Sequence, residues 1–270
     1  MAQKTDTRAQ LLTASPFQLM ISLSLPAIIG MVVVGLYSFM DRVFVGQLID
    51  QVAMGAVSVS YPFTLINSGI STLIGVGSAS VLSRAVGKKD QGTIDKIMGN
   101  LIALNLILGV IVTALGMIFT RPILSLSGAE GEILNNAERY LRIIFAGSLF
   151  VNFAQSSNMI MRGEGLLKQA MVFSGGSAIL NIILDPILIS ALEPYRTGIE
   201  GAAYATVIAQ IVYAAAMLRH FRSKSKNVRI HGIRVEKGLI PEIFGVGFSA
   251  MLMQVMTLLQ QTVLYHTAHS

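Results

Sequence analysis

Two aspartates lie inside stretches of chain that are otherwise apolar enough to cross a membrane: Asp41 in GLYSFMDRVFVG and Asp185 in LNIILDPILIS. A carboxylate in the hydrocarbon of a bilayer is costly, so it persists mainly where it faces a cavity, an ion or a partner. Helical spacing adds polar neighbours, because Tyr37 precedes Asp41, and Asn181 precedes Asp185, by one helical turn. Two carboxylates grouped with a phenol and an amide can hold a small cation or share a proton.

Each aspartate also has a purely structural interpretation. Asp41 could lie at the membrane surface and pair with Arg42, and Asp185 could cap a helix break before Pro186. The functional interpretation is stronger for Asp185, because isoleucines and leucines surround it on both sides in the sequence.

The elements that must position these residues are membrane-spanning helices. The 270 residues are 53% hydrophobic and 13% charged, whereas an ordinary soluble domain has about 25% charged residues. Apolar blocks of about 20 residues or slightly more are long enough to cross the hydrocarbon core as helices. The sequence therefore predicts an all-α, polytopic membrane protein, with a six-helix lobe and one further transmembrane helix. The blocks are 17–40, 54–82, 97–119, 141–161, 170–192, 201–221 and 241–264.

The distribution of basic residues predicts how these helices are oriented. Most of the 20 lysines and arginines lie in the N-terminal segment and in the loops after the second, fourth and sixth blocks. By the positive-inside rule these segments, including the N-terminus, are cytoplasmic. Counting along the blocks from that orientation places Asp41, Asp185 and Thr206 in the outer half of the membrane. The same loop positions make nucleic-acid binding a poor explanation of the net charge of +6.

No pattern in the sequence supports an enzyme. The chain has no cysteine and no Walker A sequence, and no Ser-His-Asp or paired-carboxylate hydrolase pattern can be assembled. Gly75-Val-Gly77 lies in an apolar block rather than after a strand, so it is not a dinucleotide-binding turn. We expect no organic cofactor.

Several ordered segments resemble one transporter family. LSLPAIIGMVVVGLYSFMDRVFVGQL is followed by GAVSVSYPF, GVGSASVLSRAVGKKD, MRGEG, NIILDPILI and GIEGAAYATVIAQ. Together they resemble the multidrug and toxic compound extrusion (MATE) family, and its bacterial branch in particular. The resemblance implies a secondary active antiporter in the bacterial inner membrane. It would export organic cations or amphipathic drug-like compounds in exchange for inward flow of H⁺ or Na⁺.

The resemblance also implies which residues form the coupling site. Asp41, Asn181, Asp185 and Thr206 would bind the proton or cation, with Na⁺ held by the two aspartates if sodium is the coupling ion. Tyr37 would lie beside them, the first helix would bend at Pro26, and Asn158 would also line the site.

The family has twelve helices in two lobes, so the resemblance implies that the second lobe of the same polypeptide is missing here. We therefore expect a fragment that is incapable of transport by itself. The expected units are a cytoplasmic segment 1–16, the six-helix lobe 17–221, a basic cytoplasmic linker 222–240, and 241–270 as the first helix of the second lobe.

Two other functions are weighed against this one. A lipid-linked oligosaccharide flippase of related fold should have basic residues in its cavity, and the apolar blocks are almost free of Lys and Arg. A seven-helix receptor or light-driven pump would use all seven blocks as its transmembrane helices. A retinal protein, however, needs a lysine in its last helix, and 238–264 contains none.

Overall fold

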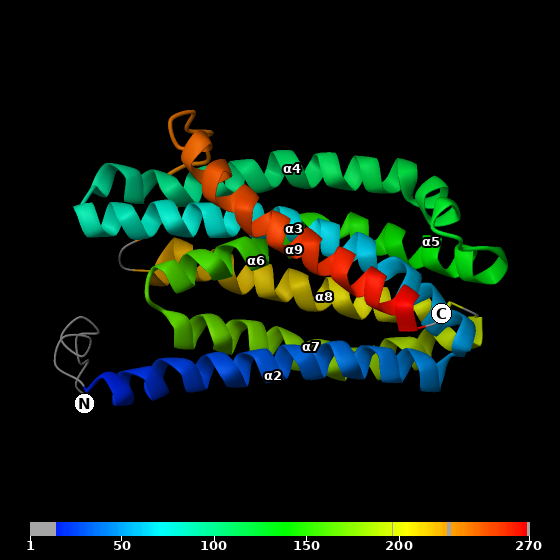
Figure 1. Ribbon diagram of the computed structural model, residues 1–270. Coiled ribbons are helices and arrows are strands. Elements are labelled where there is room, and N and C mark those ends of the chain that lie inside the picture. The colour runs from blue at the N-terminus through cyan, green and yellow to red at the C-terminus, as the bar shows by residue number, and fades with distance from the viewer. Residues whose placement is uncertain (1–14, 196, 226–227, 269–270) are drawn as a thin grey trace.

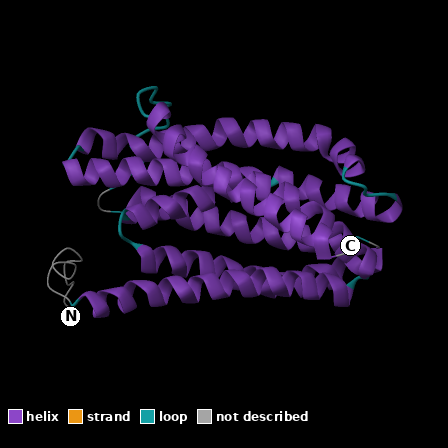
Figure 2. Ribbon diagram, viewed as in Figure 1, coloured by secondary structure: helices purple, strands orange, loops and turns teal. Residues whose placement is uncertain are grey.

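The protein is a bundle of long helices, and the computed structural model describes residues 15–195, 197–225 and 228–268, with side chains for most of them. Figures 1 and 2 show the helices running roughly along one direction, with no strand in the described ranges. The helices are α2 Pro16–Leu48, α3 Gln51–Lys88, α4 Gln91–Leu126, α5 Gly131–Ala146, α6 Ser148–Gly163, α7 Leu167–Leu192, α8 Gly198–Arg219 and α9 Ile240–Ala268, with short helical turns η1 Glu193–Tyr195 and η2 His220–Lys224.

Local sequence sets where helices α3 and α4 begin. Asp50 caps α3 by accepting a hydrogen bond from the Ala53 N–H at 2.7 Å. Asp90 does the same for α4 through the Thr93 N–H at 3.2 Å. Between these helices Lys89 adopts a left-handed conformation, with φ of 59°. The chain therefore turns within two residues, and α3 and α4 become antiparallel neighbours.

Six membrane spans account for the lobe if one of them is bent. Helices α2, α3, α4, α7 and α8 are each long and apolar enough to cross a membrane, and α5 and α6 qualify as a pair. That pair is bent by 56°, so the prediction of one uninterrupted helix over 141–161 was wrong. Gly147 lies at the break, where an added Cβ would come within 2.6 Å of the Val207 side chain in α8. The close approach of α8 explains why the smallest residue occupies the bend.

Helix α9 packs on the six-helix lobe instead of standing apart from it. Figure 1 shows α9 crossing α3 diagonally, and α3 makes its most extensive packing with this helix. Glycines permit the crossing, because a Cβ at Gly247 would lie 2.0 Å from the Leu73 carbonyl oxygen and a Cβ at Gly77 would lie 2.1 Å from that of Ile243. Within the described part of α9, the apolar stretch Ile240–Met256 is shorter than a full crossing of the membrane.

The segment before α9 is also attached to the lobe. The Glu236 N–H donates to Asn100 Oδ1 at 2.9 Å, and the Glu236 carboxylate lies 3.6 Å from the Lys96 ammonium. Gly232 approaches α4 so closely that a Cβ on Gly99 would meet its carbonyl oxygen. This part of the predicted 222–240 linker therefore packs along the surface of α4.

The helices that carry the predicted site are adjacent. Helix α2 packs mainly along α7, and α7 packs along α8; Figure 1 shows α2 and α7 side by side at one edge of the bundle. Asp41 and Asp185 are each about two turns from the end of their helix, at Leu48 and Leu192. Thr206 is a similar distance from the start of α8 at Gly198. All three residues are therefore at one level of the bundle.

Candidate functional site

Asn181, Asp185 and Thr206 form one hydrogen-bonded cluster between α7 and α8. Asp185 is fully buried and Asn181 is 2% exposed. In the amide orientation that satisfies both partners, the Asn181 NH₂ donates to Asp185 Oδ2 at 3.0 Å, and its carbonyl accepts from the Thr206 N–H at 3.1 Å. The predicted one-turn spacing of Asn181 and Asp185 thus places both side chains on one face of α7, toward α8.

Asp185 does not cap a helix break. Helix α7 continues through Pro186 to Leu192, so the capping interpretation was wrong. Pro186 has no backbone N–H to donate, and the helix continues through it without that hydrogen bond. The carboxylate is therefore held by Asn181 inside a continuous helix.

Asp41 lies on the opposing helix with less hydrogen-bonding support. It is 9% exposed, and its Oδ1 atom is buried with no hydrogen-bond partner among the described residues. No ion pair within the described part of the chain joins it to Arg42. The Arg42 guanidinium lies instead 5.2 Å from the centre of the Tyr61 ring. The two aspartates are near enough to interact electrostatically.

Two neighbouring cavities reach these residues. The first, of about 320 Å³, is lined by Tyr37, Asn181 and Thr206 at one end. The second, of about 340 Å³, is lined by Asp41. Asp185 is on neither wall and lies behind Asn181. The residues shared by both cavities are Tyr37, Ser68, Gln155, Thr206 and Gln210.

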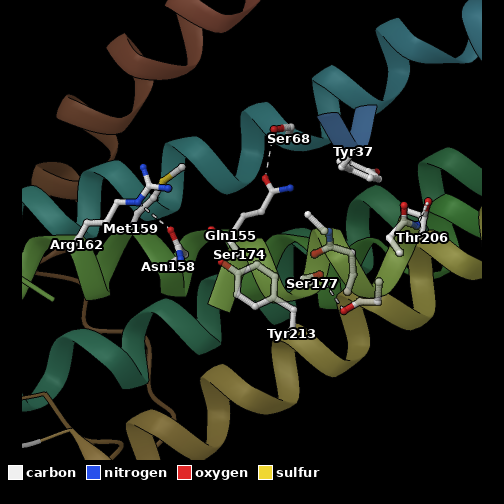
Figure 3. A pocket seen from close by; sticks show the side chains of 14 residues that line it. Tyr37, Ser68, Gln155, Asn158, Met159, Arg162, Ser174, Ser177, Thr206 and Tyr213 are labelled. Atoms are coloured by element: carbon white, nitrogen blue, oxygen red, sulfur yellow. Dashed lines mark hydrogen bonds between the residues drawn. The ribbon is translucent and has the colours of Figure 1, made fainter. Parts of the chain in front are cut away.

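The remaining two predicted residues are not confirmed as part of this cluster. Asn158 lines the first cavity, but at its opposite end, as Figure 3 shows. There it donates to the Ala170 carbonyl at 2.8 Å and accepts from Arg162 Nε at 2.9 Å. Ala170 is 11 residues before Asn181, or about 16 Å along α7. Pro26 belongs to α2, but its side chain lies outside the described residues.

Three further residues of the cavities were missed from the sequence. Gln155 Oε1 accepts from Ser71 Oγ at 2.9 Å and from Ser68 Oγ at 3.3 Å, and it lines both cavities. Tyr140 lines the second cavity together with Asp41 and is 6% exposed. Arg162, which the sequence placed in a loop, reaches the wall of the first cavity. The spacing of Asn152, Gln155 and Asn158 along one face of α6 was the available signal for a polar lining.

The MatE family model matches residues 26–187, which include Asp41, Asn181 and Asp185. The match covers more than half of the chain. The chain belongs to the MatE family. Family membership agrees with the bundle of apolar helices, and it decides against a seven-helix receptor or retinal pump.

Curated relatives of this MatE chain are bacterial drug exporters. The multidrug export protein MepA of Staphylococcus saprophyticus is 32% identical over 245 residues, which are 90% of this chain and 54% of that protein. The multidrug export protein MepA of Staphylococcus aureus strain MRSA252 is 31% identical over 242 residues, which are 89% of this chain and 53% of the relative. The chain thus spans about half the length of the curated relatives it matches.

A solved MATE structure shows the same arrangement of helices. The outward-facing conformation of a multidrug resistance MATE family transporter of the MOP superfamily is 31% identical and superposes with a TM-score of 0.83, covering 94% of this chain and 56% of that chain. The resemblance therefore extends over nearly the whole length of the MatE chain described here.

Proposed function

We propose that residues 1–270 are the cation-coupling part of a longer multidrug efflux antiporter. The observation that carries the proposal is the buried Asp41, which lines a cavity inside the bundle and whose Oδ1 has no hydrogen-bond partner among the described residues. Such a carboxylate oxygen is costly unless a proton or cation occupies it during the working cycle. Family membership and the MepA relatives supply the context of drug export.

The two aspartates have different tasks in this proposal. Asp185 is held by Asn181 and lines neither cavity, so its proposed task is to act on Asp41 electrostatically. Asp41 lines the cavity and has an oxygen available for the coupling ion. Binding at Asp41 biases the outward- and inward-facing states only if the affinity differs between them. The tilt of α2 against α7 and α8 is the motion expected to change that affinity, with Pro26 as the proposed bend.

Drug-like cations are the proposed cargo. The first cavity combines apolar and neutral polar walls, with Met159 and Tyr213 beside Gln210. In the described part of the chain its one charged lining residue is Arg162, at the end away from Asn181 (Figure 3). The Asp41 carboxylate in the neighbouring cavity would attract a cationic compound, and aromatic surface favours an amphipathic one. Both H⁺ and Na⁺ suit the Asp41–Asp185 pair as coupling ion, and no organic cofactor is needed for such an exchange.

The rest of the antiporter is proposed to continue beyond residue 270. Alternating access uses two lobes that rock against each other around a shared site, and the chain spans about half of its curated relatives. We expect the reading frame to continue past codon 270 into further apolar helices, and the protein to lie in the bacterial inner membrane with a cytoplasmic N-terminus.

The test is efflux from everted vesicles that contain the longer protein. Asp185→Asn and Asp41→Asn keep the side-chain shape and remove the charge, so each should abolish ethidium transport while leaving membrane insertion intact. Vesicles energised by a proton gradient alone or by a sodium gradient alone identify the coupling ion.

Asp95→Asn is the matched control, because Asp95 accepts a hydrogen bond from Gln91 at the surface of α4 and lies far from the cavities. It should transport at the wild-type rate. Undiminished efflux by Asp185→Asn and Asp41→Asn would refute the coupling site.

A further inference from the structure

A third cavity, which among the described residues shares only Asn67 with the cavity beside Asp41, lies between α3, α4 and α5. Its volume is about 390 Å³, and its wall is built mainly from side chains such as Ile66, Leu115 and Phe119. Leu115 is 51% exposed and Ile66 is 55% exposed, so the cavity opens on the surface of the bundle. In a membrane, that surface meets lipid chains.

The two polar side chains in this wall already have hydrogen bonds. Asn67 Oδ1 accepts from Asn152 Nδ2 at 3.0 Å, and Thr120 Oγ1 donates to the Gly116 carbonyl. A polar ligand would therefore gain little from this wall, whereas an apolar chain would bury its surface against it.

A charged cluster lies beside the outer end of the same cavity. Glu138 bridges the two helices that form the wall, with Oε2 at 2.6 Å from Arg121 Nη1 and Oε1 at 2.7 Å from Arg142 Nη2. Arg121 follows the lining residue Thr120, and Arg142 follows the lining residue Leu141. The cluster is thus at the height of the cavity mouth.

The two arginines have donors to spare. Their side chains are 58% and 54% exposed, whereas that of Glu138 is 11% exposed. A guanidinium has five N–H donors in a planar fork that matches a phosphate. One carboxylate shared by two guanidiniums leaves a net charge of +1, and Arg139 adds another cation one residue on from Glu138. Glu130 and Glu132 lie at the start of α5, about two turns from Glu138.

We propose that this place binds a membrane glycerophospholipid, with one acyl chain in the cavity and its phosphate on Arg121 and Arg142. A phospholipid matches both halves of the site, with its phosphate on the arginines and an acyl chain against the apolar wall. Inorganic phosphate matches only the arginines, and a detergent or oil chain matches only the cavity. Clusters of basic residues between membrane helices are a general way to hold lipid headgroups. The proposal is independent of drug transport.

The test is native mass spectrometry of the purified, detergent-solubilised protein titrated with dioleoylphosphatidylglycerol. Retention should fall about fivefold for each of Arg121→Gln and Arg142→Gln. Leu115→Trp, which fills the cavity without touching the charges, should also lower it. Glu138→Gln should raise retention, because it releases both guanidiniums from the carboxylate that competes with the phosphate.

Arg84→Gln is the matched control, since Arg84 is a similarly exposed arginine that pairs with Glu242 elsewhere in the bundle. It should retain phosphatidylglycerol as the wild type does. Every variant with both arginines intact should retain dioleoylglycerol, which lacks phosphate, less than phosphatidylglycerol. Equal phosphatidylglycerol retention by all variants would mean a nonspecific lipid shell and would overturn the proposal. A loss on Glu138→Gln, or no loss on Leu115→Trp, would also overturn it.

Discussion

Asp41 and Asp185 are both aspartates buried at one level of the bundle, but their surroundings differ. Asp185 receives the Asn181 amide, which is itself fixed by Thr206 on α8. Asp41 lies on a cavity wall, and no donor in the described part of the chain reaches its buried Oδ1. A buried carboxylate with a donor is already satisfied, whereas one without a donor gains most from an incoming cation. This difference is why Asp41, and not Asp185, is the proposed contact for the coupling ion.

Replacing Asn181 by leucine tests the support of Asp185. The variant removes the only side-chain donor that Asp185 has among the described residues and leaves a buried carboxylate unsatisfied. We expect the free energy of unfolding in detergent to fall by about 1–3 kcal/mol. Asn135→Leu, on the exposed side of α5, is the control and should change it by no more than about 0.5 kcal/mol. Equal effects of the two variants would show that Asn181 does not support Asp185.

Most of this cluster could be predicted from the sequence, because one-turn spacing fixes a shared face and counting from a helix end fixes depth. Asn181, Asp185 and Thr206 were found in this way, and the structure brings them together. Asn158 entered only through family resemblance. Its place near the end of its apolar block indicated a different depth, and the structure puts it at the other end of the cavity.

At the scale of helices, the site depends on close crossings that glycines make possible. Gly147 lets α8 approach the α5–α6 bend beside Val207, the neighbour of Thr206. Gly77 and Gly247 bring α3 and α9 into backbone contact. The average hydropathy of 141–161 does not report the bend, although Gly147 and Ser148 mark its position in the sequence. Hydropathy reports that a segment is buried in lipid, but not whether its axis is straight.

Helix α9 contains a matched pair of glycines for testing its crossing with α3. An added Cβ at Gly247 would meet the Leu73 carbonyl at 2.0 Å, while one at Gly245 would meet nothing within 4 Å. Gly247→Ala should therefore lower the free energy of unfolding by about 1–3 kcal/mol. Gly245→Ala should leave it unchanged or raise it by up to about 1 kcal/mol, because alanine favours the helix.

The position of α9 can be followed with cysteines placed at Thr72 and Gln254, whose side chains are hydrogen-bonded at 2.8 Å. The chain has no cysteine of its own. A short bifunctional thiol reagent should join the pair in the Gly245→Ala background and fail in the Gly247→Ala background. Equal cross-linking and equal stability in both would show that α9 does not depend on this crossing.

At the scale of the whole molecule, the direction in which the bundle crosses the membrane decides what the site can do. Asp41 on α2, Asp185 on α7 and Thr206 on α8 each lie about two turns from the same end of the bundle. The hairpin between α4 and α5 belongs to that end, and the segment before α9 belongs to the other. The excess of lysine and arginine in the latter predicts that it is cytoplasmic. The coupling site then faces the side from which protons or sodium ions enter.

Single cysteines in the cysteine-free chain test this orientation directly. Glu132, in the first turn of α5, and Lys237, before α9, are both exposed. In intact cells a membrane-impermeant maleimide should label the Glu132→Cys variant, and it should label Lys237→Cys only after the membrane is permeabilised. The reverse pattern would place Asp41 and Asp185 in the inner half of the membrane. Inward-moving ions would then reach them only after crossing most of the bilayer.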